Sequence, residues 1–406
     1  MKTIEQKAKK VPAIRFAGFE DEWVNKIFRE SFTYLQNNTL SRAELNSESG
    51  LAKNIHYGDV LVKFGECIDV AEEKIPFVSD AFVIDKFKNS FLQDGDIVIA
   101  DTAEDETVGK CTEMQGVNDA ILLSGLHTIP SRPKEKYGSK FLGYYLNSSA
   151  YRQQLLPLMQ GVKVLSISKS ALQETNLVIP KDNQEQQKIG SFFSNIDSLI
   201  SLEQKKYDKL TQVKKSMLEK MFPKEGATVP EIRFAGFTGS WERKKLGKIS
   251  NIVTGTLDAN AAQKDGLYSF FTCGKEVLKT NSYAFEGNAI LINGNGDLGF
   301  TRKFSGKFNA YQRTYVLQNF AVDFEYVEHC IHRYLPNRIV NESFGGAMPY
   351  IKLNTLSDLL LPIPSEKEMK CISLYLNDID SLISLQQRKL EKLKNIKKSL
   401  LEKMFV

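Results

Sequence analysis

The residues best suited to chemistry in this chain are polar and basic side chains that could bind the edges of nucleic-acid bases. Arginine pairs with guanine, and asparagine or glutamine with adenine, through two hydrogen bonds in the major groove. Such residues lie in or beside predicted loops of two middle segments. In the first segment they are Lys110, His127, Ser131, Arg132, Lys134, Lys163 and Lys169. In the second they are Asn293, Asn295, Arg302, Lys303, Tyr311, Gln312, Arg313 and Lys352. The alternative interpretation of each is an ordinary polar surface.

Catalytic motifs are absent from the sequence. It contains no G-x-x-x-x-G-K-[ST] phosphate loop, no H-E-x-x-H zinc pair and no Asn-Pro-Pro-Tyr type segment. Residues 294–299 fit G-x-G-x-x-G, but residues 300–306 lack a helical pattern, which favours a polar loop over a nucleotide site. His329, Cys330 and His332 lack a second ligand cluster, and neighbouring helical residues do not share a face. We therefore predict no metal site in this chain, and the missing motifs count against a catalytic centre or a cofactor of its own.

The bulk composition indicates a soluble intracellular protein. The chain has 406 residues, 42% of them hydrophobic, enough for about two or three domains. Five cysteines are widely spaced and odd in number, which favours a reducing cytoplasm over a disulfide framework. No secretory signal begins the sequence, and no apolar run reaches the roughly 20 residues of a membrane span. A net charge of +5 permits nucleic acid as a partner without arguing for it.

An internal repeat organises the elements that must position these residues. V-P-x-I-R-F-A-G-F followed by a tryptophan occurs twice, at residues 11–19 and 229–237. I-D-S-L-I-S-L occurs at residues 196–202 and 379–385, and L-E-K-M-F at residues 218–222 and 401–405. The two halves begin and end with the same sequences but differ in between. This pattern indicates one scaffold that carries two interchangeable recognition segments.

Each half ends in a long amphipathic helix. Apolar residues recur at steps of three and four, which predicts helices from Asn183 to Phe222 and from Glu366 to the chain end, each about 55–60 Å long. Asp182 with Glu185, and Ser365 with Glu368, have capping-box spacing. Gly190 permits a bend. Helices of matching sequence should pair, and we expect an antiparallel coiled coil with a pseudo-twofold axis.

The fold class we predict is α+β, with two globular domains separated by the two helices. Strands are predicted at residues 91–100, 120–124, 285–293 and 311–317, helices at residues 137–156 and 325–334, and loops at residues 101–105 and 294–296. The predicted domains are residues 1–182, with 1–12 as a flexible tail, and residues 225–364. The helices occupy residues 183–224 and 365–406.

The sequence resembles the specificity subunit of Type I restriction–modification systems along essentially its whole length. The resemblance is most specific at E-Q-Q-K-I (residues 185–189), I-D-S-L-I and the L-E-K-M-F endings. The second copy departs at residues 368–372, E-M-K-C-I, which lack the Glu-Gln pair.

The resemblance implies a division of labour. Two target-recognition domains would each read half of a split double-stranded DNA site, and the helices would space them and dock two modification subunits. Docking candidates near the helix starts are Phe192, Phe193, Ile196, Tyr375, Leu376 and Ile379. S-adenosylmethionine would belong to the modification subunits, and ATP and Mg²⁺ to the partner subunits, with restriction subunits performing translocation and cleavage. The alternatives are a coiled-coil scaffold that binds proteins and a stand-alone DNA-modifying enzyme.

Overall fold

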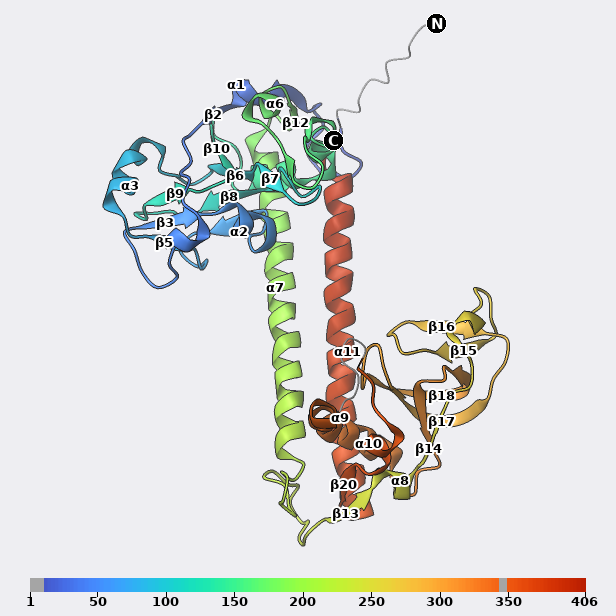
Figure 1. Ribbon diagram of the computed structural model, residues 1–406. Helices are drawn as coiled ribbons and strands as arrows, with labels where there is room; N and C mark the ends of the chain where they lie inside the picture. The colour runs from blue at the N-terminus through green and yellow to red at the C-terminus, as the bar shows by residue number, and fades with distance from the viewer. Residues whose placement is uncertain (1–10, 343–348) are drawn as a thin grey trace, which may run out of the picture. The chain divides into compact units, whose positions relative to one another are not determined.

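The computed structural model describes residues 11–342 and 349–406 (Figure 1). Contacts group the chain into two units: the chain up to Glu203 with Lys389–Val406, and Gln204–Arg388. Each unit is an α+β domain that includes part of both long helices. This grouping cuts through the helices, whereas the sequence prediction made them separate segments. Residues 1–10 of the predicted tail lie outside the described residues, and Pro12 is buried.

Unit 1 is built on a five-stranded sheet in the order β2-β10-β6-β8-β4. Its strands are β2 Phe32–Tyr34, β4 Cys67–Asp69, β6 Ile97–Ala100, β8 Cys111–Gln115 and β10 Thr128–Pro133. A smaller sheet, β5-β3-β9, comprises β3 Ala52–Ile55, β5 Phe77–Val78 and β9 Leu122–Ser124. Two ladders pair β1 Val24–Ile27 with β12 Asn176–Ile179, and β7 Thr102–Ala103 with β11 Leu165–Ser166. Short helices are α1 Phe28–Ser31, α2 Tyr57–Val62, α3 Ala81–Lys86, α4 Phe141–Asn147, α5 Ser149–Arg152 and α6 Lys169–Gln173, with 3₁₀ turns at Arg42–Glu44, Lys88–Ser90 and Leu156–Leu158.

Unit 2 is built on a six-stranded sheet in the order β14-β19-β17-β18-β15-β16. Its strands are β14 Asn251–Thr254, β15 Tyr268–Phe271, β16 Val277–Thr280, β17 Phe285–Asn293, β18 Thr301–Ala310 and β19 Thr314–Gln318. A ladder pairs β13 Glu242–Lys245 with β20 Leu360–Ile363. The helices are α8 Leu246–Ile249, α9 Phe324–Glu342 and α10 Leu353–Ser357, with a 3₁₀ turn at Ala259–Ala261.

The two sheets repeat one topology although their sequences differ. The order β2-β10-β6-β8-β4 corresponds to β14-β19-β17-β18-β15. In both sheets the first three neighbouring pairs are antiparallel and the last pair is parallel. The internal repeat therefore extends through the middles, where the sequence shows no likeness.

The long helices are α7 Asn183–Lys220 and α11 Glu366–Lys403, drawn green and red in Figure 1. Within unit 1 they run antiparallel, because Glu203 pairs with Lys389 while Asp197, earlier on α7, pairs with Lys397, later on α11. Within unit 2 Lys214 of α7 pairs with an aspartate of α11 that repeats the Asp197 position, Asp380. The predicted helix starts are confirmed. The first helix ends two residues early, and the second ends at Lys403.

The capping boxes predicted at the helix starts are only half formed. Asp182 accepts from the Gln184 amide and Ser365 from the Glu368 amide. The carboxylates of Glu185 and Glu368 turn instead to arginines of the repeated entry motif. Arg15 binds Glu185, and Arg233 binds Glu368, each through two bonds of 2.6 and 2.8 Å. In each unit the repeated V-P-x-I-R-F-A-G-F segment is thus bound to the first turn of a long helix. The hydrogen bonds to the glutamate raise the pKa of both arginines.

The repeated helix ends are anchored by the repeated tryptophans. In unit 1 the Phe405 ring packs edge-on against buried Trp23, and in unit 2 Phe222 packs in the same way against Trp241. The Ile14 amide donates to the Lys403 carbonyl at 3.0 Å, and the equivalent Ile232 amide donates to Lys220 at 2.9 Å. Each domain core therefore holds the end of the long helix that begins in the other unit.

The other predicted elements hold with exceptions. The strand at residues 285–293 is confirmed, and those at 91–100, 120–124 and 311–317 are present but shorter or shifted by a few residues. The predicted helix at 137–156 is wrong as one element: Ser148 adopts an extended backbone and caps α5, which separates it from α4. The helix predicted at 325–334 continues past Pro336 to Glu342. The predicted loop at 101–105 contains β7 because its backbone pairs with β11.

Candidate nucleic-acid interface

Three loops of unit 2 meet at Gly294, where β17 ends. The Gly294 amide donates to the carbonyl of Arg313 at 2.9 Å, and the Ile351 amide donates to the carbonyl of Gly294 at 3.0 Å. These bonds join the 294–300 loop, the turn before β19 and the segment before α10. They bring together Gln312, Arg313, Tyr350 and Lys352 around an open cavity of about 460 Å³.

Unit 1 builds the same junction from different residues. The Asp101 amide donates to the carbonyl of His127 at 3.1 Å, and the Ile167 amide donates to the carbonyl of Asp101 at 2.9 Å. Asp101 therefore corresponds to Gly294, and His127 to Arg313. The His127 side chain is 46% exposed, and its Nδ1 lies 3.3 Å from the Asp101 carboxylate. Its ring stands edge-on to Tyr57, 5.2 Å between centroids.

Other predicted DNA-binding residues lie in the segments next to these junctions in the sequence. In unit 1, Lys163 is exposed in the turn before β11, and Lys169 begins α6 with its Nζ over the Tyr34 ring. In unit 2, half-buried Asn295 lies in the loop that starts at Gly294, and Tyr311 precedes Gln312 in the turn before β19. Such surface loops are where binding residues are usually found.

Several predicted candidates already have internal partners. Lys110 Nζ donates to the carbonyls of Leu61 and Phe64 at the end of α2, and burial lowers its pKa. Arg132 grips buried Asp96 with two bonds of 2.9 and 2.7 Å.

The remaining engaged candidates follow the same pattern. Lys134 donates to the Arg29 carbonyl. Arg302 donates to the Lys275 and Gly274 carbonyls and stacks on the Phe300 ring. Lys303 binds Glu325 and Glu328. These residues support the fold, and their side chains are not free for DNA in this structure.

Two buried candidates have polar atoms without a partner among the described residues. Asn293 is fully buried at the end of β17, and neither atom of its amide group is hydrogen-bonded there. Ser131 is also fully buried, and its hydroxyl finds no partner in the same part of the chain. Both side chains are therefore closed off from the surfaces on which Arg313 and His127 lie in their own units.

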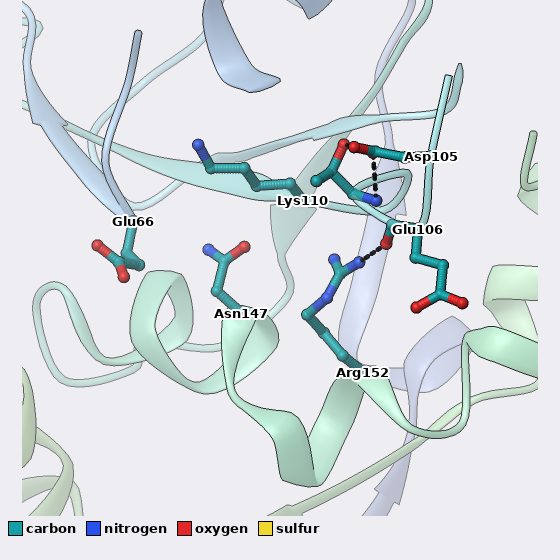
Figure 2. Close-up of a pocket in the computed structure, with 7 residues that line it drawn as sticks. Glu66, Asp105, Glu106, Lys110, Asn147 and Arg152 are labelled. Atoms are coloured by element: carbon teal, nitrogen blue, oxygen red, sulfur yellow. Dashed lines mark hydrogen bonds between the residues drawn. The ribbon is translucent and has the colours of Figure 1, made fainter. Parts of the chain in front are cut away.

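A larger cavity of about 580 Å³ lies beside the connection between β6 and β8 (Figure 2). It is lined by Glu66, Asp105, Glu106, Thr107, Lys110, Asn147 and Arg152. Arg152 donates to the main-chain carbonyls of Glu106 and Val108, and burial lowers its pKa. The two cationic residues of this cavity, Lys110 and Arg152, thus both bind main-chain carbonyls. These bonds stabilise the connection between β6 and β8, which starts at Asp101.

The predicted docking residues lie mostly inside their own units. Phe193, Ile196, Leu376 and Ile379 are buried in the cores and are not available to a partner in this structure. Phe192 packs against Phe16, and Tyr375 against Phe234, as equivalent aromatic pairs.

A second apolar stripe on the long helices is exposed instead. Leu199 and Leu202 on α7 are each 48% exposed, and their repeats on α11, Leu382 and Leu385, are 51% and 59% exposed. Sequence reasoning missed this stripe because it placed Leu199 and Leu382 on the buried face and left Leu202 and Leu385 out of the pattern. The signal was available in the helix angle: at 3.6 residues per turn, Leu199 and Leu202 lie about 60° and 120° around the helix from Ile196, on the side away from buried Phe193.

No group of three His, Cys, Asp or Glu side chains suited to a metal ion occurs within residues 11–342 and 349–406. His329, one of the residues weighed as a ligand, is buried with its Nε2 3.1 Å from Asn377 Oδ1, and Cys330 lies in the apolar core. Across the same described residues, no helix combines the length and apolar character that a membrane crossing requires.

Comparison with known proteins gives one consistent family. The model of the Type I restriction modification DNA specificity domain matches residues 69–212 and 239–395. The Type I restriction enzyme EcoDI specificity subunit of Escherichia coli is 35% identical over 158 residues, which cover 39% of this chain and 35% of that protein. A putative Type I restriction enzyme specificity subunit of Methanocaldococcus jannaschii, MjaX, is 25% identical over 336 residues, 76% of each chain.

Solved structures agree on the fold. The crystal structure of a Type I restriction–modification S subunit from M. genitalium matches with a TM-score of 0.59 and 16% identity, covering 98% of this chain and 99% of that one. A chain from a structure of Type I system assembly matches with a TM-score of 0.55 and 14% identity, covering 94% and 97%.

These matches confirm the resemblance, the two-domain α+β fold and the prediction of a specificity subunit rather than a catalytic one. They give no support to a protein-binding scaffold or a stand-alone enzyme. Because the family model covers both halves and most of the length, this chain belongs to the Type I restriction–modification DNA specificity family.

Proposed function

We propose that this chain reads a bipartite site in double-stranded DNA, with each domain recognising one half. The observation that carries the proposal is the junction at Gly294 and Asp101. Both domains hold three loops together with the same two backbone bonds, yet they present different side chains, Arg313 in one and His127 in the other. A constant frame with variable exposed residues suits the recognition of two different sequences.

Exchange of one domain tests this function. Residues 13–180 are replaced by the equivalent part of a relative with another specificity, and the hybrid is expressed with its modification subunit. Sequencing of methylated host DNA should show one half of the site changed and the other retained. Change in both halves would reject independent reading, and the reciprocal exchange of the second domain is the matched control.

We further propose that the long helices dock two modification subunits and set the spacing of the half-sites. Support for docking comes from the exposed leucines. The surrounding sequence, I-D-S-L-I-S-L, is identical in both copies. Packing in the core accounts for the identity of Ile196 and Ile379, which are buried, but not for that of Leu199 and Leu382, which are exposed. Repeated exposed apolar residues favour two equivalent protein interfaces. The spacer role rests on helices that continue unbroken from one unit into the other.

In this proposal the chain supplies recognition and the partners supply reaction. S-adenosylmethionine would bind the modification subunits, and ATP and Mg²⁺ would serve the partner subunits, including the restriction subunits that translocate and cleave DNA. This chain would need no cofactor of its own. We place its work in the cytoplasm, where an intracellular DNA-binding complex would meet its substrate.

A further inference from the structure

Arg313 differs from the other arginines because its side chain has no partner in the described part of the chain. Within the described residues its guanidinium makes no hydrogen bond or ion pair, and the residue is exposed. The other eleven of the twelve arginines each donate to, or stack on, a neighbouring group. An arginine without an intramolecular role is available for a ligand, and the fork of donors on its guanidinium fits two acceptors that lie side by side.

The backbone that carries Arg313 is held firmly. Its carbonyl accepts from the Gly294 amide at 2.9 Å and from the Cys273 thiol at 3.3 Å. The next residue, Thr314, is fully buried and pairs with Asn293 in the sheet. A rigid main chain thus presents a side chain without fixed contacts, which reduces the entropy lost on binding to the rotamers of that side chain alone.

His127 occupies the corresponding position of the other domain. Its carbonyl accepts from the Asp101 amide as that of Arg313 accepts from Gly294, and Thr128 and Thr314 follow as buried first residues of β10 and β19. The correspondence was invisible in the sequence, because the segments between the repeats differ in length and composition. The residue directly before this buried threonine is therefore at the same place in both domains but differs in type. We call it the frame position, and we expect it to contribute to a difference in DNA specificity between the domains.

We propose that this frame position reads a base in each half-site. Arg313 binds guanine through its O6 and N7 in the major groove, and His127 contacts the base at the equivalent place of the other half-site. The proposal rests on the proposed function, because it assumes that the domains bind DNA. It goes further by naming two specificity-determining residues and, for Arg313, the base.

The test uses the complex with its modification subunit. Methylated sites are sequenced for the unaltered chain, then for Arg313→Gln, Arg313→Lys and His127→Gln. Arg313→Gln should relax one guanine position of one half-site and weaken binding to the original site about 5- to 140-fold. Arg313→Lys, which retains the charge without the fork, should retain part of the preference. His127→Gln should alter only the other half-site. Arg29→Gln, an exposed arginine bound to Glu174, is the control and should alter neither.

A modified base makes the test specific for the proposed contact. Replacing that guanine by 7-deazaguanine removes the N7 acceptor. It should weaken binding by the unaltered complex and have little further effect on Arg313→Gln. A uniform loss of affinity for every sequence would show a phosphate contact and overturn the proposal, as would a change in the wrong half-site or no change. If the unaltered complex recognises no bipartite site at all, the proposed function itself fails, and that outcome is visible before any variant is made.

Discussion

At the residue scale, Glu113 is a buried carboxylate in unit 1 whose pKa differs clearly from its ordinary value. Its carboxylate, in β8, is almost fully buried and accepts from the backbone amides of Lys140 and Gly143 at 2.7 and 2.9 Å. It therefore caps the first turn of α4 from a neighbouring strand. Burial raises the pKa of Glu113 to about 7, against the opposing effect of these hydrogen bonds.

This environment predicts a pH-dependent stability. A carboxyl group with a folded-state pKa above its ordinary value of 4.5 binds its proton more tightly in the folded state. Its stabilising contribution is complete below about pH 4.5 and is lost as the pH rises through about 7, on the order of 3 kcal/mol. Glu113→Gln should flatten this part of the profile. Thermal unfolding midpoints of both proteins between pH 5 and 8 measure it, and parallel profiles would contradict the prediction.

Residue types could be chosen from sequence, but free residues could not be separated from engaged ones. Arg132 and Arg313 look alike in the sequence. Only the fold brings Asp96, 36 residues away in the sequence, against Arg132, and among residues 11–342 and 349–406 it leaves Arg313 without such a partner. Partner choice depends on strand pairing between distant segments, which local patterns do not encode. The same reason concealed the use of Glu185 and Glu368 by the entry-motif arginines.

At the element scale, the long helices were predictable almost to the residue and the sheets were not. A sustained period of three to four residues, with a capping residue at its start, determines α7 and α11 locally. The strand order requires contacts between segments many residues apart. At the break between α4 and α5, the Asn147 side chain binds both main-chain groups of Cys111, a contact with a distant strand that local patterns do not encode.

Gly190 shows how a helix position can be dictated by its neighbour. The sequence permits a bend there, yet α7 is continuous. A Cβ on Gly190 would lie 2.2 Å from the Ser139 carbonyl oxygen and 3.0 Å from the Phe141 amide nitrogen. The backbone of the 138–141 loop rests directly on the helix, and the glycine exists for that close approach.

Gly190→Ala should therefore destabilise unit 1 although alanine favours helices. Overpacking against a backbone costs about 1–3 kcal/mol, more than the gain in helix propensity of about 1 kcal/mol. Chemical denaturation, monitored by circular dichroism, measures the change. Gly58→Ala in α2 is the matched control. A Cβ at Gly58 would meet only side-chain atoms of His56 and Arg42, at ordinary distances of 3.4 Å or more. Equal behaviour of the two variants would show that the loop yields without cost.

At the scale of the whole molecule, the chain builds each domain from both of its halves. The core of unit 1 includes Met404 and Phe405 from the chain end, and the core of unit 2 includes Met221 and Phe222 from the end of α7. Truncation within either long helix would consequently expose the core of the domain that receives its end. The near-identity of the repeated ends fits this shared demand, because both domains present a tryptophan to the same Met-Phe pair.

Packing in the domain cores does not explain the four exposed leucines, because their side chains lie outside those cores. They lead to a prediction about assembly. If each repeated pair is one docking surface, Leu199→Asp with Leu202→Asp should remove one modification subunit, and Leu382→Asp with Leu385→Asp should remove the other. A charge placed in an apolar interface costs several kcal/mol because its hydration is lost without compensation. All four substitutions together should leave the chain without either partner.

Light scattering of the purified complexes gives their masses and therefore the number of subunits retained. Ser201→Asp and Ser384→Asp are the controls: they introduce the same charge at exposed positions directly beside the leucines, pointing away from the stripe. They should preserve the full assembly. Loss of both partners from a single pair of leucine substitutions would mean that the two surfaces act together as one site. Full assembly with all four leucines replaced would place docking elsewhere and leave the exposed repeat without a function.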